Sequence, residues 1–123
     1  MALEARAKKG NFFHVYDFRV KPGTGNKFID LFNDFDYSDE NPMHKSTAQV
    51  KDGVLCRDVD DEDLFYLIGE WRDIEIHREI RKQMVEMAPE FATLLEKLPF
   101  EPIYAEIVTE TPQEILDKAQ TPT

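Results

Sequence analysis

Apolar and polar residues alternate along four segments of the chain, and apolar residues recur at helical spacing along two others. Alternation rich in aromatic and β-branched residues predicts strands, whereas a spacing of three to four residues predicts amphipathic helices. Strands are therefore predicted at 12–20, 54–59, 64–71 and 103–108, with helices that follow Thr24 and Asp73. This βαββαβ order is typical of a ferredoxin-like α+β fold with a four-stranded antiparallel sheet.

Turn and capping residues separate these elements. Residues 21–25 contain a proline and two glycines, which break the first strand. Residues 43–52 are predicted to add a short helical piece that ends at Gly53. Pro89 is predicted to kink or restart the second helix, because proline lacks an N–H, and the apolar stripe continues to Leu98.

The length of 123 residues suits a single domain. We expect residues 1–11 to form a flexible arm, residues 12–108 to form the folded domain and residues 109–123 to form a tail. In the tail, Thr111 and Glu114 form a capping pattern that predicts a short helix.

Both faces of the predicted sheet carry apolar side chains. On the first strand one face holds Phe12, His14, Tyr16, Phe18 and Val20, and the other holds Phe13, Val15, Asp17 and Arg19. Two helices cover only one face, and monomers rarely expose so large an apolar area. We therefore expect a homodimer that packs sheet against sheet around a two-fold axis. The alternative is that the tail covers the open face, but one short helix is too small for that.

The charge and composition of the chain exclude several kinds of binding partner and location. The formal net charge of −10 argues against binding to nucleic acid or to anionic membranes. No apolar run approaches a membrane span, and the N-terminal segment lacks the apolar core of a secretory signal. The single cysteine, Cys56, cannot form an internal disulfide. We expect a soluble, cytoplasmic protein.

Two stretches, FFHVYDFRVKPGTGNKFIDLF and GVLCRDVDDEDLFYLIGEW, together resemble the antibiotic biosynthesis monooxygenase (ABM) domain family. The shared features are a strand that ends in Lys21-Pro22-Gly23 before a helix, an Arg-Asp turn, a strand that ends in Glu70-Trp71, and a long following helix. The resemblance covers about residues 12–108. It implies a dimeric α+β barrel with a pocket in each subunit between the sheet and its helices.

The same resemblance implies an activity. The family includes oxidoreductases that oxidise polyketide aromatics or quinols with dioxygen and without metal or flavin. We therefore expect a monooxygenase without cofactors that acts on a small electron-rich aromatic of the phenol, quinol or anthrone type. The alternative is a non-catalytic, small-ligand-binding or stress-associated dimer of the same fold. Haem degradation, which one branch of the family performs, is not expected. The resemblance implies that this branch uses a Trp, an Asn and a His. Trp71 matches the Trp, but the Asn position falls on Val15 and the His position lies near Ile80.

The predicted substrate-binding residues are Phe13, Val15, Gly69, Trp71 and Met84. Trp71 and Gly69 share one strand face, and the missing side chain of Gly69 would leave space for a pocket. The alternative for Trp71 is that its ring fills the core between sheet and helices.

His77 is the candidate catalytic residue, as a proton acceptor whose ordinary pKa is near neutrality. The alternative is a boundary histidine, because His77 lies one turn before the position that the family uses. His14 is expected to face the dimer interface, and Glu70, expected near that interface, needs a polar partner.

No metal site is expected. The sequence has no HxH or HExxH spacing, so a histidine site would require His14, His44 and His77 to converge through folding. The acidic run at residues 58–63 lacks the glycine and the glutamate of a calcium-binding EF-hand loop, and we interpret it as a solvated hairpin turn.

Overall fold

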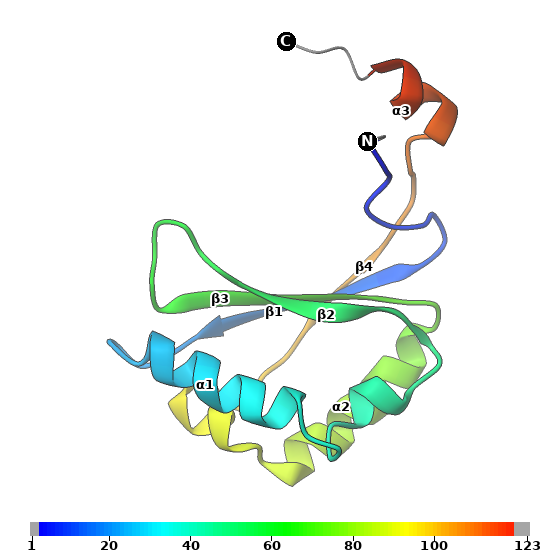
Figure 1. Ribbon diagram of the computed structural model, residues 1–123. Helices are drawn as coiled ribbons and strands as arrows, with labels where there is room; N and C mark the ends of the chain where they lie inside the picture. The colour runs from blue at the N-terminus through cyan, green and yellow to red at the C-terminus, as the bar shows by residue number, and fades with distance from the viewer. Residues whose placement is uncertain (1–2, 120–123) are drawn as a thin grey trace.

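The computed structural model describes residues 3–119 and has one four-stranded antiparallel sheet in the order β2-β3-β1-β4 (Figure 1). The strands are β1 (Phe12–Arg19), β2 (Gln49–Arg57), β3 (Leu64–Trp71) and β4 (Ile103–Glu106). The helices are α1 (Gly25–Asp36), α2 (Ile74–Met87) and α3 (Gln113–Ala119), with 3-10 turns η1 (Pro42–Lys45) and η2 (Glu90–Leu94). The predicted ferredoxin-like α+β fold is confirmed.

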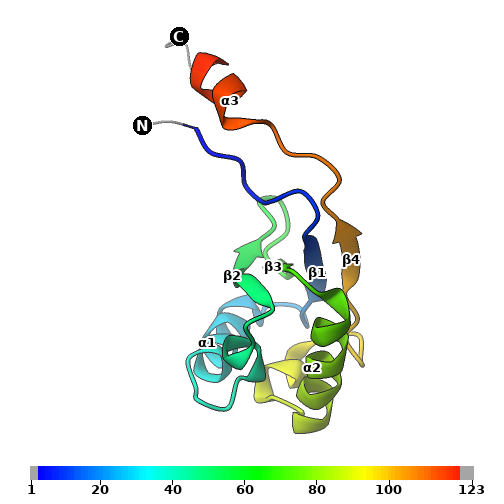
Figure 2. The ribbon, with the colours of Figure 1, turned by 90° about the vertical axis from the view of Figure 1, so that its right-hand side faces the viewer.

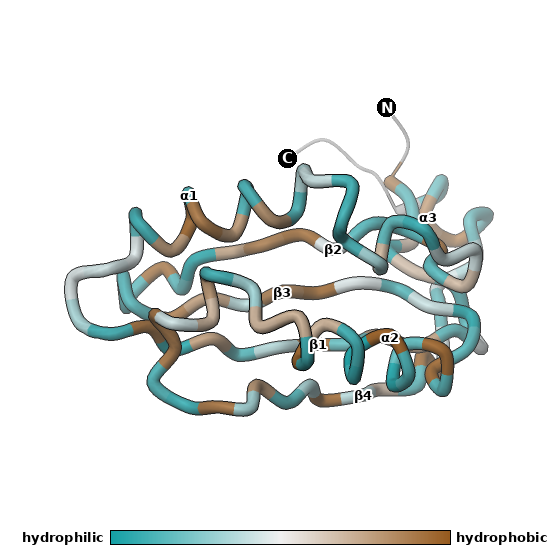
Figure 3. The backbone as a smooth tube through the Cα atoms, turned by 90° about the horizontal axis from the view of Figure 1, so that it is seen from below, coloured by the Kyte–Doolittle hydropathy of each residue, from teal (hydrophilic) through white to brown (hydrophobic). Residues whose placement is uncertain are grey.

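Helices α1 and α2 and the turn η2 lie on one face of the sheet (Figures 1 and 2). Apolar and polar residues recur in turn along both helices (Figure 3), so each helix has an apolar side, which packs toward the sheet, and a polar side. Aromatic rings fill the layer between the sheet and these helical segments. Phe18 of β1 meets Phe28 of α1 with 5.8 Å between ring centroids, and Phe28 meets Phe91 of η2 at 5.9 Å. These edge-to-face contacts are the arrangement that aromatic pairs prefer.

The pairing of β1 with β3 determines which side chains face the helices. His14 lies opposite Gly69 and Tyr16 lies opposite Leu67, and both His14 and Tyr16 are buried under the helices. The expectation that His14 faces away from the helices is wrong. Phe13 and Val15 take the open face, together with the exposed Asp17. They therefore lie on the opposite face from Trp71 and Gly69, contrary to the predicted grouping.

The second strand begins earlier than predicted. Gln49 and Lys51 pair with β3 and so belong to β2. Of the predicted helical piece at 43–52, only residues 43–45 are helical, as part of the 3-10 turn η1. Gly53 lies inside β2, where the register is irregular between Lys51 and Val54, and it ends no helix. Pairing with β3 overrides the weak local signal of these polar residues.

The helix ends follow the capping rules in part. Asp73 caps α2 as predicted, because its Oδ1 accepts a hydrogen bond from the Glu75 backbone N–H at 3.0 Å. Thr24 precedes α1, but its hydroxyl donates to the Lys21 carbonyl and makes no capping bond. Helix α2 ends at Met87, before Pro89, and η2 follows as a separate turn. The apolar stripe beyond Pro89 therefore does not continue as α-helix.

The two chain ends rise together from one end of the open face (Figures 1 and 2). The Gly10 N–H donates to the Ile107 carbonyl at 2.9 Å, and the Ile107 N–H donates to the Asn11 carbonyl at 2.8 Å. The predicted short helix of the tail is present as α3. Residues 1–2 of the predicted arm and residues 120–123 of the predicted tail lie outside the described residues.

Glu70 on the open face is 3% exposed, and it finds its partners in the arm. Its Oε2 accepts hydrogen bonds from Asn11 Nδ2 at 2.8 Å and from the Lys8 backbone N–H at 3.1 Å. These bonds offset the cost of burying the carboxylate. Within residues 3–119, no helix has both the length and the apolar character that crossing a membrane requires.

Candidate functional site

A narrow cavity of about 30 Å³ lies beneath the sheet, between α1, η1 and α2. Its walls are largely apolar and include Phe32, Met43, Leu67 and Met84, with His14 and Tyr16 of β1 also in the lining. A volume of this size holds about one or two water molecules. The cavity is therefore closed to an aromatic ring in this conformation.

Behind the cavity wall, Trp71 holds His14 in one orientation. The indole Nε1–H donates a hydrogen bond to His14 Nδ1 at 2.7 Å, and both side chains are buried. Because Nδ1 accepts this bond, a neutral His14 carries its proton on Nε2. His14 can therefore donate a hydrogen bond from Nε2 to a bound ligand.

Gly69 makes room for this arrangement. A Cβ atom at Gly69 would lie 2.5 Å from His14 Cε1 and 3.0 Å from His14 Nδ1, which is closer than real contacts allow. The space that the sequence suggested at Gly69 thus exists, but the imidazole of His14 fills it.

His77 of α2 contacts both His14 and Trp71, and we call these three buried residues the His14 cluster. The ring of His77 stacks on the ring of His14 with centroids 4.3 Å apart and planes 16° apart, and its Nδ1 lies 2.8 Å from the Tyr104 hydroxyl of β4.

Among residues 3–119, three buried polar side-chain atoms find no hydrogen-bond partner: His77 Nε2 and the Tyr16 hydroxyl in this region, and Glu70 Oε1 on the open face of the sheet. Buried polar groups are normally paired, so both His77 Nε2 and the Tyr16 hydroxyl could accept a further partner. Tyr16 lines the cavity, whereas His77 lies outside the lining, behind it.

Burial keeps both imidazoles neutral. It lowers the pKa of His14 to about 4. It also lowers the pKa of His77 to about 3, with smaller contributions from the charges of His14 and Arg81. The pKa of Tyr16 is raised, mainly by burial. At neutral pH the cluster therefore presents uncharged donors and acceptors.

His44 lies apart from the other two histidines, at the polar end of the cavity lining. Its Nε2 is 2.8 Å from Asp52 Oδ1 and 3.4 Å from Asp36 Oδ1. The three histidines thus do not converge on one site, although His14 and His77 do meet. The acidic run at 58–63 forms a turn in which Asp58 accepts a hydrogen bond from Tyr66 at 2.6 Å.

The structure brings together only some of the predicted site residues. Trp71, Gly69 and His77 meet in the buried cluster, and Met84 lines the cavity. Phe13 and Val15 lie on the other face of the sheet. That His14 belongs to this cluster was not predicted from the sequence. The charged Asp17 next to Phe18 indicates which face of β1 is buried, and His14 lies on the same face as Phe18.

Solved structures share this fold. A structure named as a proposed antibiotic biosynthesis monooxygenase from Bordetella bronchiseptica has a TM-score of 0.61 and 14% identity, over 82% of this chain and 100% of that one. SnoaB from Streptomyces nogalater, named as a cofactor-independent oxygenase, has a TM-score of 0.57 and 15% identity, over 84% and 96%. A structure from Caulobacter crescentus, named as a proposed antibiotic biosynthesis monooxygenase, has a TM-score of 0.62 and 12% identity, over 82% of this chain and 92% of that one.

These similarities confirm the resemblance to ABM proteins at the level of the fold. The sequence matches no family model. It also matches no curated protein. The class of the molecule is thus an α+β protein with an ABM-type fold, and its activity is a matter for proposal.

Gly69→Ala is expected to destabilise the protein by about 1–3 kcal/mol, because the added methyl group overlaps the His14 ring. Urea unfolding followed by Trp71 fluorescence measures the change. Gly53→Ala is the matched control, since its methyl group meets the flexible Leu67 side chain at 3.2 Å. Equal unfolding free energies for the two variants would show that His14 does not need the space above Gly69.

Stability is expected to fall as the pH drops below about 6.5, the ordinary pKa of histidine. The folded-state pKa values of about 4 and about 3 mean that the unfolded chain binds more protons than the folded one in this range. Each such proton changes the free energy of unfolding by about 1.4 kcal/mol per pH unit. The stability that the two neutral histidines contribute is fully present above the pKa of histidine in the unfolded chain. It is lost as the pH falls toward their pKa values in the folded protein.

The matched variant for this pH dependence is His77→Gln, which removes one titrating ring. Urea unfolding of wild type and variant between pH 5.0 and 7.0 should give a slope that is smaller in the variant by about one proton. Identical slopes would mean that His77 titrates normally in the folded protein.

Proposed function

We propose that the protein is a cofactor-independent monooxygenase that acts on a small electron-rich aromatic of the phenol, quinol or anthrone type. One observation carries the proposal: an apolar cavity with His14 and Tyr16 in its wall, in a fold shared with a cofactor-independent oxygenase. Such a cavity excludes water and offers uncharged hydrogen-bonding groups to an oxygen of the substrate.

The proposed reaction needs only substrate and dioxygen. For an anthrone-type substrate, one CH₂ group is oxidised to C=O, and dioxygen is reduced, with one oxygen atom in the product and the other in water. Loss of a proton first gives an electron-rich anion, which passes an electron to dioxygen. The protein contributes by lowering the free energy of that anion and by keeping water away from it.

His14 is the residue we place against the substrate anion. Its Nε2–H would donate to the anionic oxygen, and the Trp71 hydrogen bond at Nδ1 keeps that proton on Nε2. His77 is retained as the candidate proton acceptor, since its Nε2 has no partner among the described residues. Its low pKa makes it a weak base, so the substrate itself must be acidic.

The cavity must enlarge before an aromatic ring can enter. A benzene-sized ligand needs a cavity of about 150 Å³, several times the observed volume of about 30 Å³. Two flexible methionines, Met43 and Met84, line the space and can change rotamer at low cost. We therefore expect substrate binding to be coupled to rearrangement of these side chains.

A homodimer in the cytoplasm is part of the proposal. The open sheet face carries partly exposed Phe13, Val15, Tyr66 and Ile68, and a second copy would cover them. The arm and the α3 segment rise beside this face and would flank the second copy (Figure 1).

The second candidate function is binding of a small apolar ligand without catalysis. The low pKa values of His14 and His77 favour it, because neither ring is a strong base at neutral pH. Under this alternative the same cavity opens for the ligand, but no oxygen is consumed.

Oxygen uptake by metal-free and flavin-free protein tests the proposal with a panel of hydroquinones and anthrones. We expect uptake by the wild type and a loss of at least about tenfold in Trp71→Phe, which removes the donor to His14, since one preorganised hydrogen bond is worth about that much or more. Tyr37→Phe, on the surface, is the control and should match the wild type. Sedimentation should show that all three proteins are folded dimers.

One result would count against catalysis, and another would count against the assigned site. Ligand-induced quenching of Trp71 fluorescence without any oxygen uptake would favour the binding protein. Equal uptake by wild type and Trp71→Phe would place the chemistry away from the His14 cluster.

A further inference from the structure

We propose that Asp36, His44 and Asp52 form a site for a divalent first-row metal ion at the polar end of the cavity. This inference goes beyond the proposed oxygenase function and does not depend on it. The candidate ligands come from three separate elements: Asp36 ends α1, His44 lies in η1, and Asp52 lies in the irregular part of β2. Folding, rather than sequence proximity, brings them together.

The spacing of the donor atoms fits one shared ion. One atom from each residue lies within 4.8 Å of the other two. His44 Nε2 is 2.8 Å from Asp52 Oδ1 and 3.4 Å from Asp36 Oδ1. Ligand atoms bound at about 2.1 Å from an ion are about 3.0 Å apart in octahedral geometry and about 3.4 Å apart in tetrahedral geometry. The two separations from His44 Nε2 are therefore close to those that ligands of one ion require.

A buried asparagine supports the site. Asn41 is 4% exposed, and its Nδ2 donates to Asp36 Oδ1 at 3.2 Å. Its Oδ1 accepts a hydrogen bond from the Met43 backbone N–H at 3.0 Å, which starts the turn that carries His44. One side chain thus orients both a carboxylate ligand and the element of the imidazole ligand, as hydrogen bonds around metal ligands commonly do.

The local charge also favours a cation. Two carboxylates, the partly buried Asp36 and the exposed Asp52, lie within reach of one position beside His44. Without a metal, the close approach of His44 Nε2 and Asp52 Oδ1 is that of a hydrogen bond, which needs a proton on Nε2. A metal ion would take the place of that proton.

The ligand set indicates which ions to test. Two carboxylates and one imidazole suit Zn²⁺ or Mn²⁺ better than Ca²⁺, which prefers oxygen ligands alone. Three protein ligands leave coordination positions for water or for a small molecule. An ion here would tie α1, η1 and β2 together beside Met43 and Gln49 of the cavity lining.

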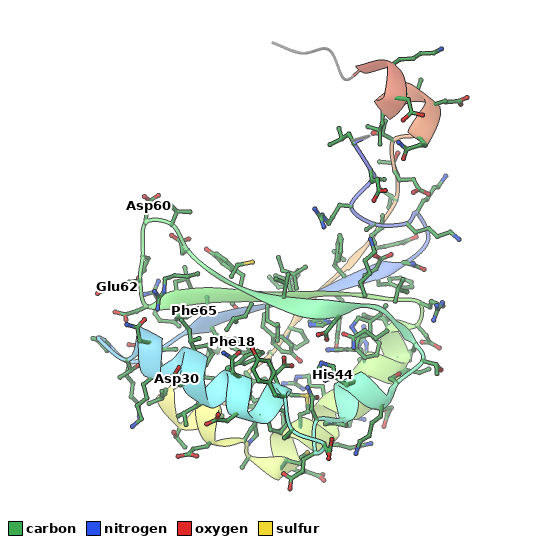
Figure 4. All side chains as sticks on the ribbon, in the orientation of Figure 1. Phe18, Asp30, His44, Asp60, Glu62 and Phe65 are labelled. Atoms are coloured by element: carbon green, nitrogen blue, oxygen red, sulfur yellow. The ribbon has the colours of Figure 1, made fainter. Side chains whose placement is uncertain are left out.

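Isothermal titration of untagged, chelator-treated protein with zinc chloride, and separately with manganese chloride, tests the site at pH 7.5. We expect one ion per chain for at least one metal, with affinity at least tenfold weaker in His44→Gln and in Asp52→Asn. Asp30→Asn is the matched control, because this exposed carboxylate lies on α1 away from His44 (Figure 4) and should leave the affinity unchanged.

The proposal is overturned if the wild type binds neither metal more tightly than millimolar, which would leave only a contact between His44 and the two carboxylates. It is also overturned if Asp52→Asn and His44→Gln bind as tightly as Asp30→Asn while circular dichroism shows all variants folded. Because the readout is binding, a failed oxygen-uptake experiment has no bearing on either result.

Discussion

The hydrogen bond from Trp71 to His14 is the interaction on which the interior depends. It joins residues 57 positions apart on neighbouring strands and satisfies two polar groups that would be costly to bury alone. The close approach is possible because the facing residue on β3 is Gly69. The imidazole so fixed is the surface on which His77 of α2 stacks, and His77 in turn meets Tyr104 of β4. Contacts that start from this one bond thus connect β1, β3 and β4 with α2.

The same bond limits the chemistry that the interior can perform. It fixes the neutral tautomer of His14, and burial keeps that ring uncharged. A site of this kind stabilises an anion by oriented dipoles rather than by a full positive charge, which suits a substrate that is already acidic. The ionisable groups Asp36, His44 and Asp52 line the cavity at its other end. The cavity thus has an uncharged hydrogen-bonding wall and a charged end with metal-ligand chemistry.

The sequence was a good guide to the element order and a poor guide to which side of β1 is inside. Periodicity located all four strands and both core helices, because each has one clearly apolar face or stripe. On the first half of β1, however, Phe13 and Val15 are as apolar as Tyr16, so only the charged Asp17 and Arg19 further along mark the exposed side. The space at Gly69 was visible in the sequence, but its occupant was not, because it comes from another strand.

Contacts between distant residues account for the rest of what was missed. No local pattern links His77 to Tyr104, or Asp36 to His44 and Asp52, since these pairs meet only through the packing of different elements. The early start of β2 has the same origin, because Gln49 and Lys51 gain their strand conformation from pairing with β3.

Histidine nitrogen NMR tests the central claim most directly, through long-range ¹H–¹⁵N correlations recorded between pH 7.5 and 5.5. The account predicts that His14 stays neutral over this range, with its proton on Nε2, its Nδ1 as an acceptor and the Trp71 indole N–H protected from exchange. A His14 that titrates near pH 6.5, the ordinary pKa of histidine, or a Trp71 N–H that exchanges freely, would contradict it.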